Sequence, residues 1–277
     1  MNWKSIILAV YHSLDDDRVL AVAAGVTFYA LLAIFPAIGA LVSLYGLFAD
    51  PLAIRDTMSA MSTMLPGGAL DIVGEQIQRV SAAGSGKLSV TFVSGLAIAL
   101  WGANAGIKAL FDAVNVAYGK KEERGFLKLN LISLTFTLVG IVLALTILGG
   151  VVILPHAITY LGLDSSIDIA LRYGRWPIIW LIVALAFSLL YRFGPTDSLN
   201  PKWKWITWGS AIASLLWLLA SILFSWYTAN FGSYNETYGS LGAAIGFMTW
   251  LWLSATVIIV GAEINSEIEQ AVGEPHA

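Results

Sequence analysis

The sequence contains no cysteine and few charged residues. Of its 277 residues, 12% are Asp, Glu, Lys or Arg, whereas an average soluble domain has about 25%. The absence of cysteine excludes disulfides, thiolate metal sites and a thiol nucleophile. A disordered chain combines high charge with low hydrophobicity, so the low charge excludes that class. It also argues against an ordinary soluble enzyme.

Clusters of chemically reactive residues are also missing. The three histidines stand far apart, at positions 12, 156 and 276. The chain has no P-loop, no G-x-S-x-G and no H-E-x-x-H motif. Its net charge is −3, so no global basic field attracts nucleic acid. We therefore expect no metal site, no cofactor, no enzymatic activity and no nucleic-acid partner.

What the sequence has in abundance is apolar residues. They make up 58% of the chain, and the mean hydropathy is +0.77. A spanning helix needs about 20 predominantly apolar residues. This composition predicts an all-α, polytopic membrane bundle with six transmembrane helices, forming a single domain over residues 1–270 with a short cytoplasmic tail at 271–277. The predicted spans are 20–48, 90–113, 130–154, 176–194, 205–229 and 239–262.

Shorter amphipathic segments flank these spans. The apolar residues of 2–14 repeat at helical spacing and predict an interfacial helix, after which Asp15, Asp16 and Asp17 offer N-cap oxygens to the first span. Pro36 is expected to kink that span. The 49–89 connection is predicted to contain two short amphipathic helices, broken at 66–68, and a flexible link at 82–87.

The distribution of Lys and Arg predicts the orientation. Loops on the side of the N-terminus carry nine of these residues and loops on the other side carry five. Because cytoplasmic loops are enriched in Lys and Arg, we expect both termini in the cytoplasm. The nine are Lys4, Arg18, Lys120, Lys121, Arg124, Lys128, Arg192, Lys202 and Lys204, and the five are Arg55, Arg79, Lys87, Arg172 and Arg175.

The second span carries a polar stripe. Asn104, Lys108, Asp112 and Asn115 follow Trp101 at spacings that place them on one helix face. An ionisable residue inside a membrane is a functional-site hypothesis by default. One reading is a seam facing the bundle interior, where Lys108 binds an anion, a phosphate head group or a carboxylate. The alternatives are that Lys108 snorkels to the interface or pairs with Asp112.

Glu263 closes the sixth span and shares a face with Glu267. Glutamates at a membrane boundary are most often solvated. The functional alternative is that Glu263 pairs with Lys108 or binds a proton. A carboxylate near a helix C-terminus meets an unfavourable dipole, which favours a specific partner.

Small residues and a tyrosine-bearing turn complete the pattern. Gly102/Gly106 and Gly242/Gly246 are spaced for close helix packing, as is the pair Ala21/Gly25. They predict contact among spans one, two and six and equally permit a homodimer. The 230–239 connection is interpreted as a tight external turn with interfacial tyrosines, or alternatively as the mouth of a cavity.

Four segments resemble the YihY/BrkB family of bacterial inner-membrane proteins: 26–36 (VTFYALLAIFP), 100–118 (LWGANAGIKALFDAVNVAY), 231–242 (FGSYNETYGSLG) and 261–267 (GAEINSE). The resemblance implies a six-helix protein of the bacterial inner membrane. Members of that family carry names such as virulence factor, transporter and ribonuclease BN. The residues that match the motifs are Thr27, Tyr29, Pro36, Trp101, Lys108, Asn115, Tyr118, Tyr234, Asn235, Tyr238, Gly239, Glu263 and Asn265.

Three functions follow from these patterns and from the family resemblance. The first is transport or handling of a lipid or small anionic envelope compound, through a cavity between spans one, two and six lined by Asn104, Lys108, Asp112, Asn115 and Glu263. The second is an envelope scaffold that binds partners, besides membrane lipids, through its amphipathic helices. The third is a membrane-bound ribonuclease. It ranks lowest because the chain lacks a metal motif and a basic face.

Overall fold

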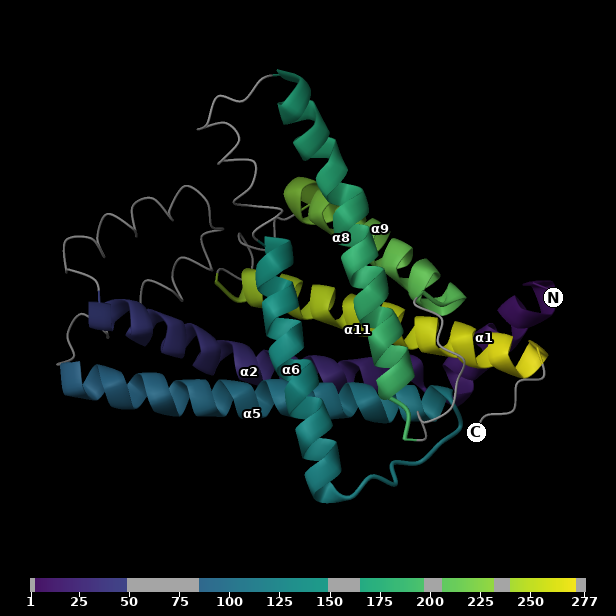
Figure 1. Ribbon diagram of the computed structural model, residues 1–277, viewed down its shortest axis with the longest axis horizontal. Helices are drawn as coiled ribbons and strands as arrows, with labels where there is room; N and C mark the ends of the chain where they lie inside the picture. Colours follow the sequence, from purple (N-terminus) through teal and green to yellow (C-terminus); the bar gives the residue numbers. More distant parts are fainter. Residues whose placement is uncertain (1–2, 49–84, 149–164, 197–205, 232–239, 273–277) are drawn as a thin grey trace. The chain divides into compact units, whose positions relative to one another are not determined.

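The computed structural model describes residues 3–48, 85–148, 165–196, 206–231 and 240–272 (Figure 1). Within these ranges the regular structure is entirely α-helical, which confirms the predicted all-α class. The helices are α1 (Trp3–Asp16), α2 (Val19–Phe48), α5 (Ser85–Ala117), α6 (Phe126–Leu148), α8 (Ser165–Phe193), α9 (Trp208–Phe231) and α11 (Ser240–Val272).

Five of these helices are long and apolar enough to cross a membrane: α5, α6, α8, α9 and α11. A sixth span results if α1 and α2, which are bent by 60° at their junction, are taken together. Large apolar side chains such as Leu127, Leu131 and Val142 are exposed. Lipid, unlike water, imposes no cost on such exposure. The chain is therefore a multi-pass helical membrane protein.

Three described helix bounds differ from the predicted spans by more than four residues. α8 begins at Ser165, ahead of the predicted start at 176, and α11 continues to Val272, beyond the predicted end at 262. Hydropathy marks only the apolar part of a helix, whereas the hydrogen-bonded backbone continues past it. α5 begins at Ser85, so the end of the segment predicted as a flexible link is helical. The two amphipathic helices predicted within the 49–89 connection fall on residues 49–84, which lie outside the described residues.

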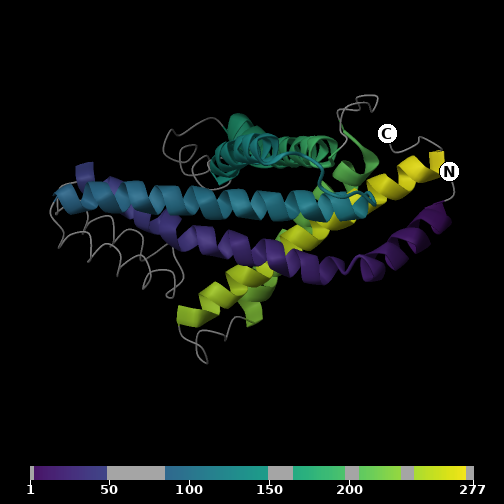
Figure 2. The ribbon, with the colours of Figure 1, turned by 90° about the horizontal axis from the view of Figure 1, so that it is seen from below.

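The described helices contribute to two compact units. Unit 2 comprises residues 24–106 and 221–253. In it, α2 and α5 run side by side (Figures 1 and 2). A Cβ built at Gly102 would lie 3.0 Å from the Ala33 backbone, which confirms the predicted close packing of spans one and two. At Gly25 and Gly246 such a Cβ meets no described atom within 4 Å, so a tight seam is absent there.

Unit 1 comprises residues 1–23, 107–220 and 254–277. It contains α1, α6, α8, the end of α5, most of α9 and the end of α11. Phe111 of α5 packs edge-on against Phe136 of α6, with ring centroids 5.2 Å apart. The Trp217 indole of α9 donates a hydrogen bond to Ser254 Oγ of α11 at 3.0 Å. These contacts hold unit 1 together, and most of the predicted polar residues lie in it.

Candidate functional site

The end of α11, residues 261–267, contacts three other helices of unit 1. At Gly261 the backbone approaches α8 and α9 so closely that an added Cβ would collide with the Tyr191 hydroxyl and lie 2.5 Å from Ala213 Cβ. The same hydroxyl donates a hydrogen bond to the Ile258 carbonyl at 2.7 Å. Glycine is therefore required here by packing.

Asn265 fastens the start of α9. Its Oδ1 accepts a hydrogen bond from the Gly209 amide at 2.9 Å, and its Nδ2 donates to Thr207 Oγ1 at 2.8 Å. The first amides of a helix have no partner within the helix and need one from elsewhere. Thr207 and Ser210 supply others, because each backbone amide donates to the other's hydroxyl. Asn265, a predicted supporting residue, thus acts as a buried helix cap.

Glu263 lies between these two structural positions and has no comparable role. Only 1% of its surface is exposed. Its carboxyl group lies within hydrogen-bonding reach of the Asp17 carboxyl, and Glu267 is a further negative neighbour. Its other oxygen, Oε1, is buried without a hydrogen-bond partner. A buried carboxyl oxygen without a partner is costly, so the position calls for an explanation beyond packing.

The bounds of α1 correct the predicted capping role for two residues of the aspartate run. Asp15 and Asp16 belong to the last turn of α1, and Arg18 adopts a positive φ of 49° at the junction. The first backbone bonds of α2 go to the Arg18 carbonyl, from the amides of Ala21 and Val22. Because α1 runs to Asp16 and the chain turns sharply at Arg18, Asp17 lies beside Glu263.

A second contact fixes α1 against α11. Ser13 Oγ donates a hydrogen bond to Glu267 Oε1 at 3.2 Å. At the other end of α1, Trp3 packs edge-on against Trp208 of α9, with ring centroids 5.8 Å apart. The views agree that α1 lies beside the end of α11 (Figures 1 and 2). The predicted N-terminal helix is confirmed, and its buried residues are Ile6 and Val10.

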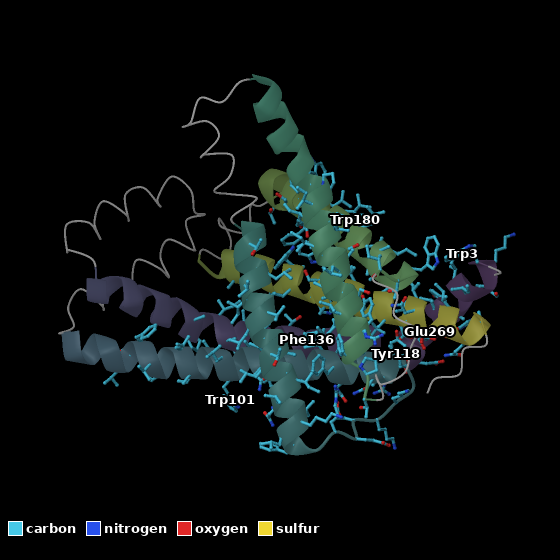
Figure 3. The ribbon with its side chains drawn as sticks, in the orientation of Figure 1. Trp3, Trp101, Tyr118, Phe136, Trp180 and Glu269 are labelled. Atoms are coloured by element: carbon cyan, nitrogen blue, oxygen red, sulfur yellow. The ribbon has the colours of Figure 1, made fainter. Side chains whose placement is uncertain are left out.

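Tyr118 joins the end of α5 to the same region. It is buried, hydrogen-bonds with Asn265 and lies next to Glu269 (Figure 3). Burial is the main cause that raises the pKa of this phenol well above its usual range, and the Glu269 and Glu263 carboxylates add to the effect. Tyr118 therefore remains a hydrogen-bond donor at physiological pH.

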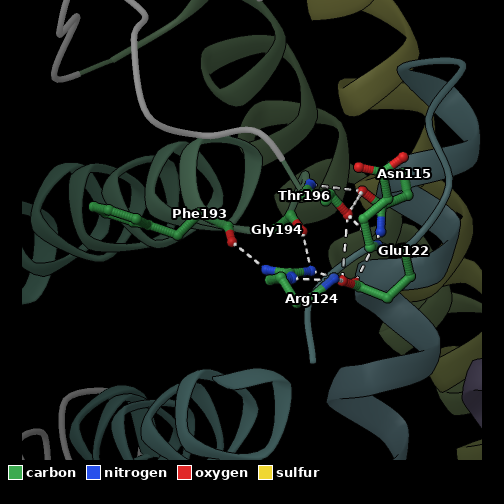
Figure 4. A network of polar contacts seen from close by, with 7 residues as sticks. Asn115, Glu122, Arg124, Phe193, Gly194 and Thr196 are labelled. Atoms are coloured by element: carbon green, nitrogen blue, oxygen red, sulfur yellow. Dashed lines mark hydrogen bonds and ion pairs between the residues drawn. The ribbon is translucent and has the colours of Figure 1, made fainter. Parts of the chain in front are cut away.

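Asn115 is the centre of a second polar network (Figure 4). Its side chain is fully buried. Its Oδ1 accepts a hydrogen bond from the Thr196 amide at 2.9 Å, and its Nδ2 donates to Glu122 Oε2 at 3.1 Å. Asn115 thus links α5 to the α5–α6 connection and to the segment that follows α8.

Arg124 closes this second network. Its side chain is 3% exposed and pairs with Glu122, donating through Nε to Glu122 Oε1 at 2.7 Å. It also donates to the carbonyls of Phe193 and Gly194 at 3.1 and 2.7 Å, where α8 ends and unpaired carbonyls carry negative partial charge. Hydrogen bonds from Arg124 are the main cause that lowers the pKa of the Glu122 carboxyl to about 2.

The predicted stripe on α5 is divided by the structure. Lys108 is half-buried, and its ammonium donates to Asn130 Oδ1 of α6 at 2.6 Å. Asp112 is exposed and forms no ion pair with Lys108, both residues being described. Asn104 lies in unit 2, where its Oδ1 is buried without a partner, and Trp101 is exposed.

All four of Asn115, Tyr118, Glu263 and Asn265 lie in unit 1. Tyr118 meets Asn265 and Glu263, whereas Asn115 belongs to the second network. The predicted alternative of a Lys108–Glu263 pair is not found, because each of these residues has a different partner. Thr27 is buried in α2, Tyr29 is exposed on the same helix, and Pro36 lies inside it. Tyr234, Asn235, Tyr238 and Gly239 lie outside the described residues.

Sequence reasoning did not single out Asp17, Glu122, Arg124 or Tyr191 as partners of this region. Asp17 lies far from Glu263 in the sequence, and Glu122 lies in a loop. Helical periodicity carries no signal in either case. Glu267 was noticed because it shares a helix face with Glu263. That face of α11 meets α1 and the residue that follows it. The described residues contain no group of three or more His, Cys, Asp or Glu side chains that could hold a metal ion.

Comparison with known proteins supports the resemblance noted from the motifs. The family model described as virulence factor BrkB matches residues 10–277. The chain belongs to the BrkB family. Among BrkB relatives, a ribonuclease-like protein, YfkH of Bacillus subtilis, is 32% identical over 88% of both chains. A UPF0761 membrane protein of Haemophilus influenzae is 24% identical over 99% of this chain and 98% of its own.

A UPF0761 membrane protein of Neisseria meningitidis serogroup B is also similar, at 26% identity over 96% of this chain and 63% of its own length. The two UPF0761 names describe membrane proteins without giving a substrate. No solved structure matches this chain.

Proposed function

We propose that this BrkB-family protein transports or handles a lipid or another anionic envelope compound in the bacterial inner membrane, with both termini in the cytoplasm. The observation that carries the proposal is the buried carboxyl group of Glu263. It sits in a spanning helix and has one oxygen without a hydrogen-bond partner. Buried ionisable groups within membranes mark substrate, ion or proton pathways.

The residues around Glu263 make this position distinctive. Gly261 and Asn265, on either side of it in the sequence, are accounted for by helix packing and by the α9 cap. Asn115 and Tyr118 lie in the same unit and are also buried. Helix packing therefore explains the positions of Gly261 and Asn265 but not the burial of Glu263. Lys108, with one bond to Asn130, is proposed as the cationic residue that meets an anionic head group.

Reconstituted vesicles test the proposal. Purified protein is placed in vesicles containing fluorescent phosphatidylglycerol, and the transfer of the lipid between leaflets is followed by chemical quenching of the outer leaflet. We expect faster transfer than in protein-free vesicles, and a loss of about tenfold or more in Glu263→Gln and Lys108→Ala, which corresponds to about 1.4 kcal/mol. Glu123→Gln is the matched control, because Glu123 is exposed in the α5–α6 connection.

The outcomes separate the candidate functions. Transfer at the protein-free rate would overturn lipid handling by this protein. If Glu263→Gln and Lys108→Ala both restore every phenotype of a deletion strain, the site is wrong and the scaffold function gains support. In that case deletion of 51–82 should abolish function.

The name of the YfkH relative supplies one observation for a second function, ribonuclease activity. We propose that this chain is not an enzyme, because its sequence offers no basic face for RNA and no nuclease motif. RNA cleavage by a highly purified sample, lost on a point substitution in this chain, would contradict that proposal.

A further inference from the structure

The junction between α1 and α2 places one carboxyl group against another. Asp17 and Glu263 lie within hydrogen-bonding reach, and Glu263 is almost completely buried. Two carboxylates have acceptor oxygens only, so a hydrogen bond between them requires one proton. Like charges held this close in a site of low dielectric do not both remain ionised.

A second observation points to a ligand at the same place. Glu263 Oε1 is buried and has no hydrogen-bond partner among the described residues. If the carboxyl group stayed ionised, this buried oxygen would carry negative charge with no hydrogen bond to offset it. Protonation of the carboxyl group removes that charge. The hydroxyl group of Ser13, on α1, donates to Glu267.

We propose that Asp17 and Glu263 together bind a single proton, and that this proton fastens the α1–α2 junction to α11. With the proton bound, one carboxyl donates to the other and α1 stays docked through that bond and the Ser13–Glu267 bond. When the proton leaves to water, two carboxylates face each other and repel. The junction then loosens.

The other charged groups around the pair fit this inference. Glu267 adds a third negative group on the same face of α11, which raises the cost of a second charge on the pair. The phenol of Tyr118 stays neutral because of its burial. Farther from the pair, Tyr191 of α8 and Glu269 of α11 lie next to Tyr118. Asp15, Asp16 and Arg18 are the charged neighbours of Asp17 in the sequence.

The inference deepens the proposed function, since it rests on the same Glu263 and would supply proton coupling to transport. The inference can also be tested without a transport assay, because proton binding and helix docking are measured on the purified protein alone. A protein that binds the proton but moves no lipid would leave this inference intact and overturn the proposed function.

Infrared difference spectroscopy tests proton binding directly. The carbonyl stretching band of a protonated carboxylic acid is followed from about pH 5 to about pH 9. We expect a band that persists above the pH where ordinary carboxyl groups titrate and that is absent from Asp17→Asn and Glu263→Gln. Asp16→Asn is the matched control and should keep the band, because the Asp16 side chain is exposed at the end of α1.

Spin labels test docking. The chain has no cysteine, so Leu8→Cys on α1 and Gln270→Cys on α11 give one labelled pair at exposed positions. We expect the distance between the labels to lengthen and broaden as the pH rises. Asp17→Asn should abolish this change and keep α1 docked, since the amide donates as the protonated acid does. An unchanged wild-type distance, or a full pH response in Asp17→Asn, would overturn the inference.

Discussion

At the scale of single residues, Glu122 shows how Arg124 sets the charge of the α5–α6 connection. Hydrogen bonds from Arg124 lower the pKa of Glu122 from 4.5 to about 2. A carboxyl group whose pKa is lower in the folded protein stabilises it above the unfolded pKa, and this stabilisation is lost as the pH falls. The relevant window therefore runs from about pH 4.5 down to about pH 2.

We predict that Glu122→Gln lowers the thermal stability at neutral pH, because the Arg124 charge is left buried without a carboxylate partner. The difference between wild type and variant should shrink as the pH falls through the window. Thermal unfolding in a mild detergent at a series of pH values measures it. Glu123→Gln, at the neighbouring exposed position, should track the wild type. A constant difference down to pH 2 would contradict the role given to Arg124.

Sequence reasoning at this scale found residues but not their partners. Asn115 was identified by its place on a polar helix face, yet its bonds go to a loop carboxylate and to a threonine after α8. Helical spacing describes one element at a time, so it cannot show which loop returns to that element. The contact of Asp17 was missed for the same reason. Helical spacing within α1 or α2 does not show that Asp17 lies beside Glu263 of α11.

At the scale of helices, the packing of α8, α9 and α11 depends on Gly261. We predict that Gly261→Ala destabilises the protein by roughly 1–3 kcal/mol, the usual cost of overpacking a core. The added methyl would collide with the Tyr191 hydroxyl and the Ala213 side chain. Chemical unfolding in mixed micelles measures the change.

Gly140→Ala provides the comparison, because a Cβ on that part of α6 meets no described atom within 4 Å. This variant should be as stable as the wild type or slightly more so, since alanine favours the helix. Equal losses in the two variants would mean that helix propensity, and not the approach of α11 to Tyr191, decides the stability.

The helix bounds show where hydropathy succeeds and fails. α2 begins and ends within one residue of the predicted span, because its whole length is apolar. α11 runs past its predicted end to Val272 because Glu263 and Asn265 are buried by neighbouring helices of unit 1 and not by lipid. A scale that measures transfer into lipid assigns such residues to the outside. A hydropathy scale therefore misses polar helix residues that are buried by neighbouring helices.

At the scale of the whole molecule, the orientation rests on Lys and Arg counts of nine against five. The loop between α5 and α6 carries Lys120, Lys121 and Arg124, and Lys128 follows in the first turn of α6. Arg124 is buried in the polar network, but Lys121 and Lys128 are exposed and free to face anionic lipid head groups. The negative surface potential of the cytoplasmic leaflet favours such residues on that side.

We predict that Lys121→Cys is labelled by a membrane-impermeant maleimide only after spheroplasts are permeabilised, whereas Arg55→Cys is labelled in intact spheroplasts. The wild-type chain has no cysteine, so it gives no background label. The reverse pattern would place both termini outside the cytoplasm. Glu263, at the same end of the bundle as the α1 contacts, would then face the external side, and the proton held with Asp17 would exchange with the periplasm and not with the cytoplasm.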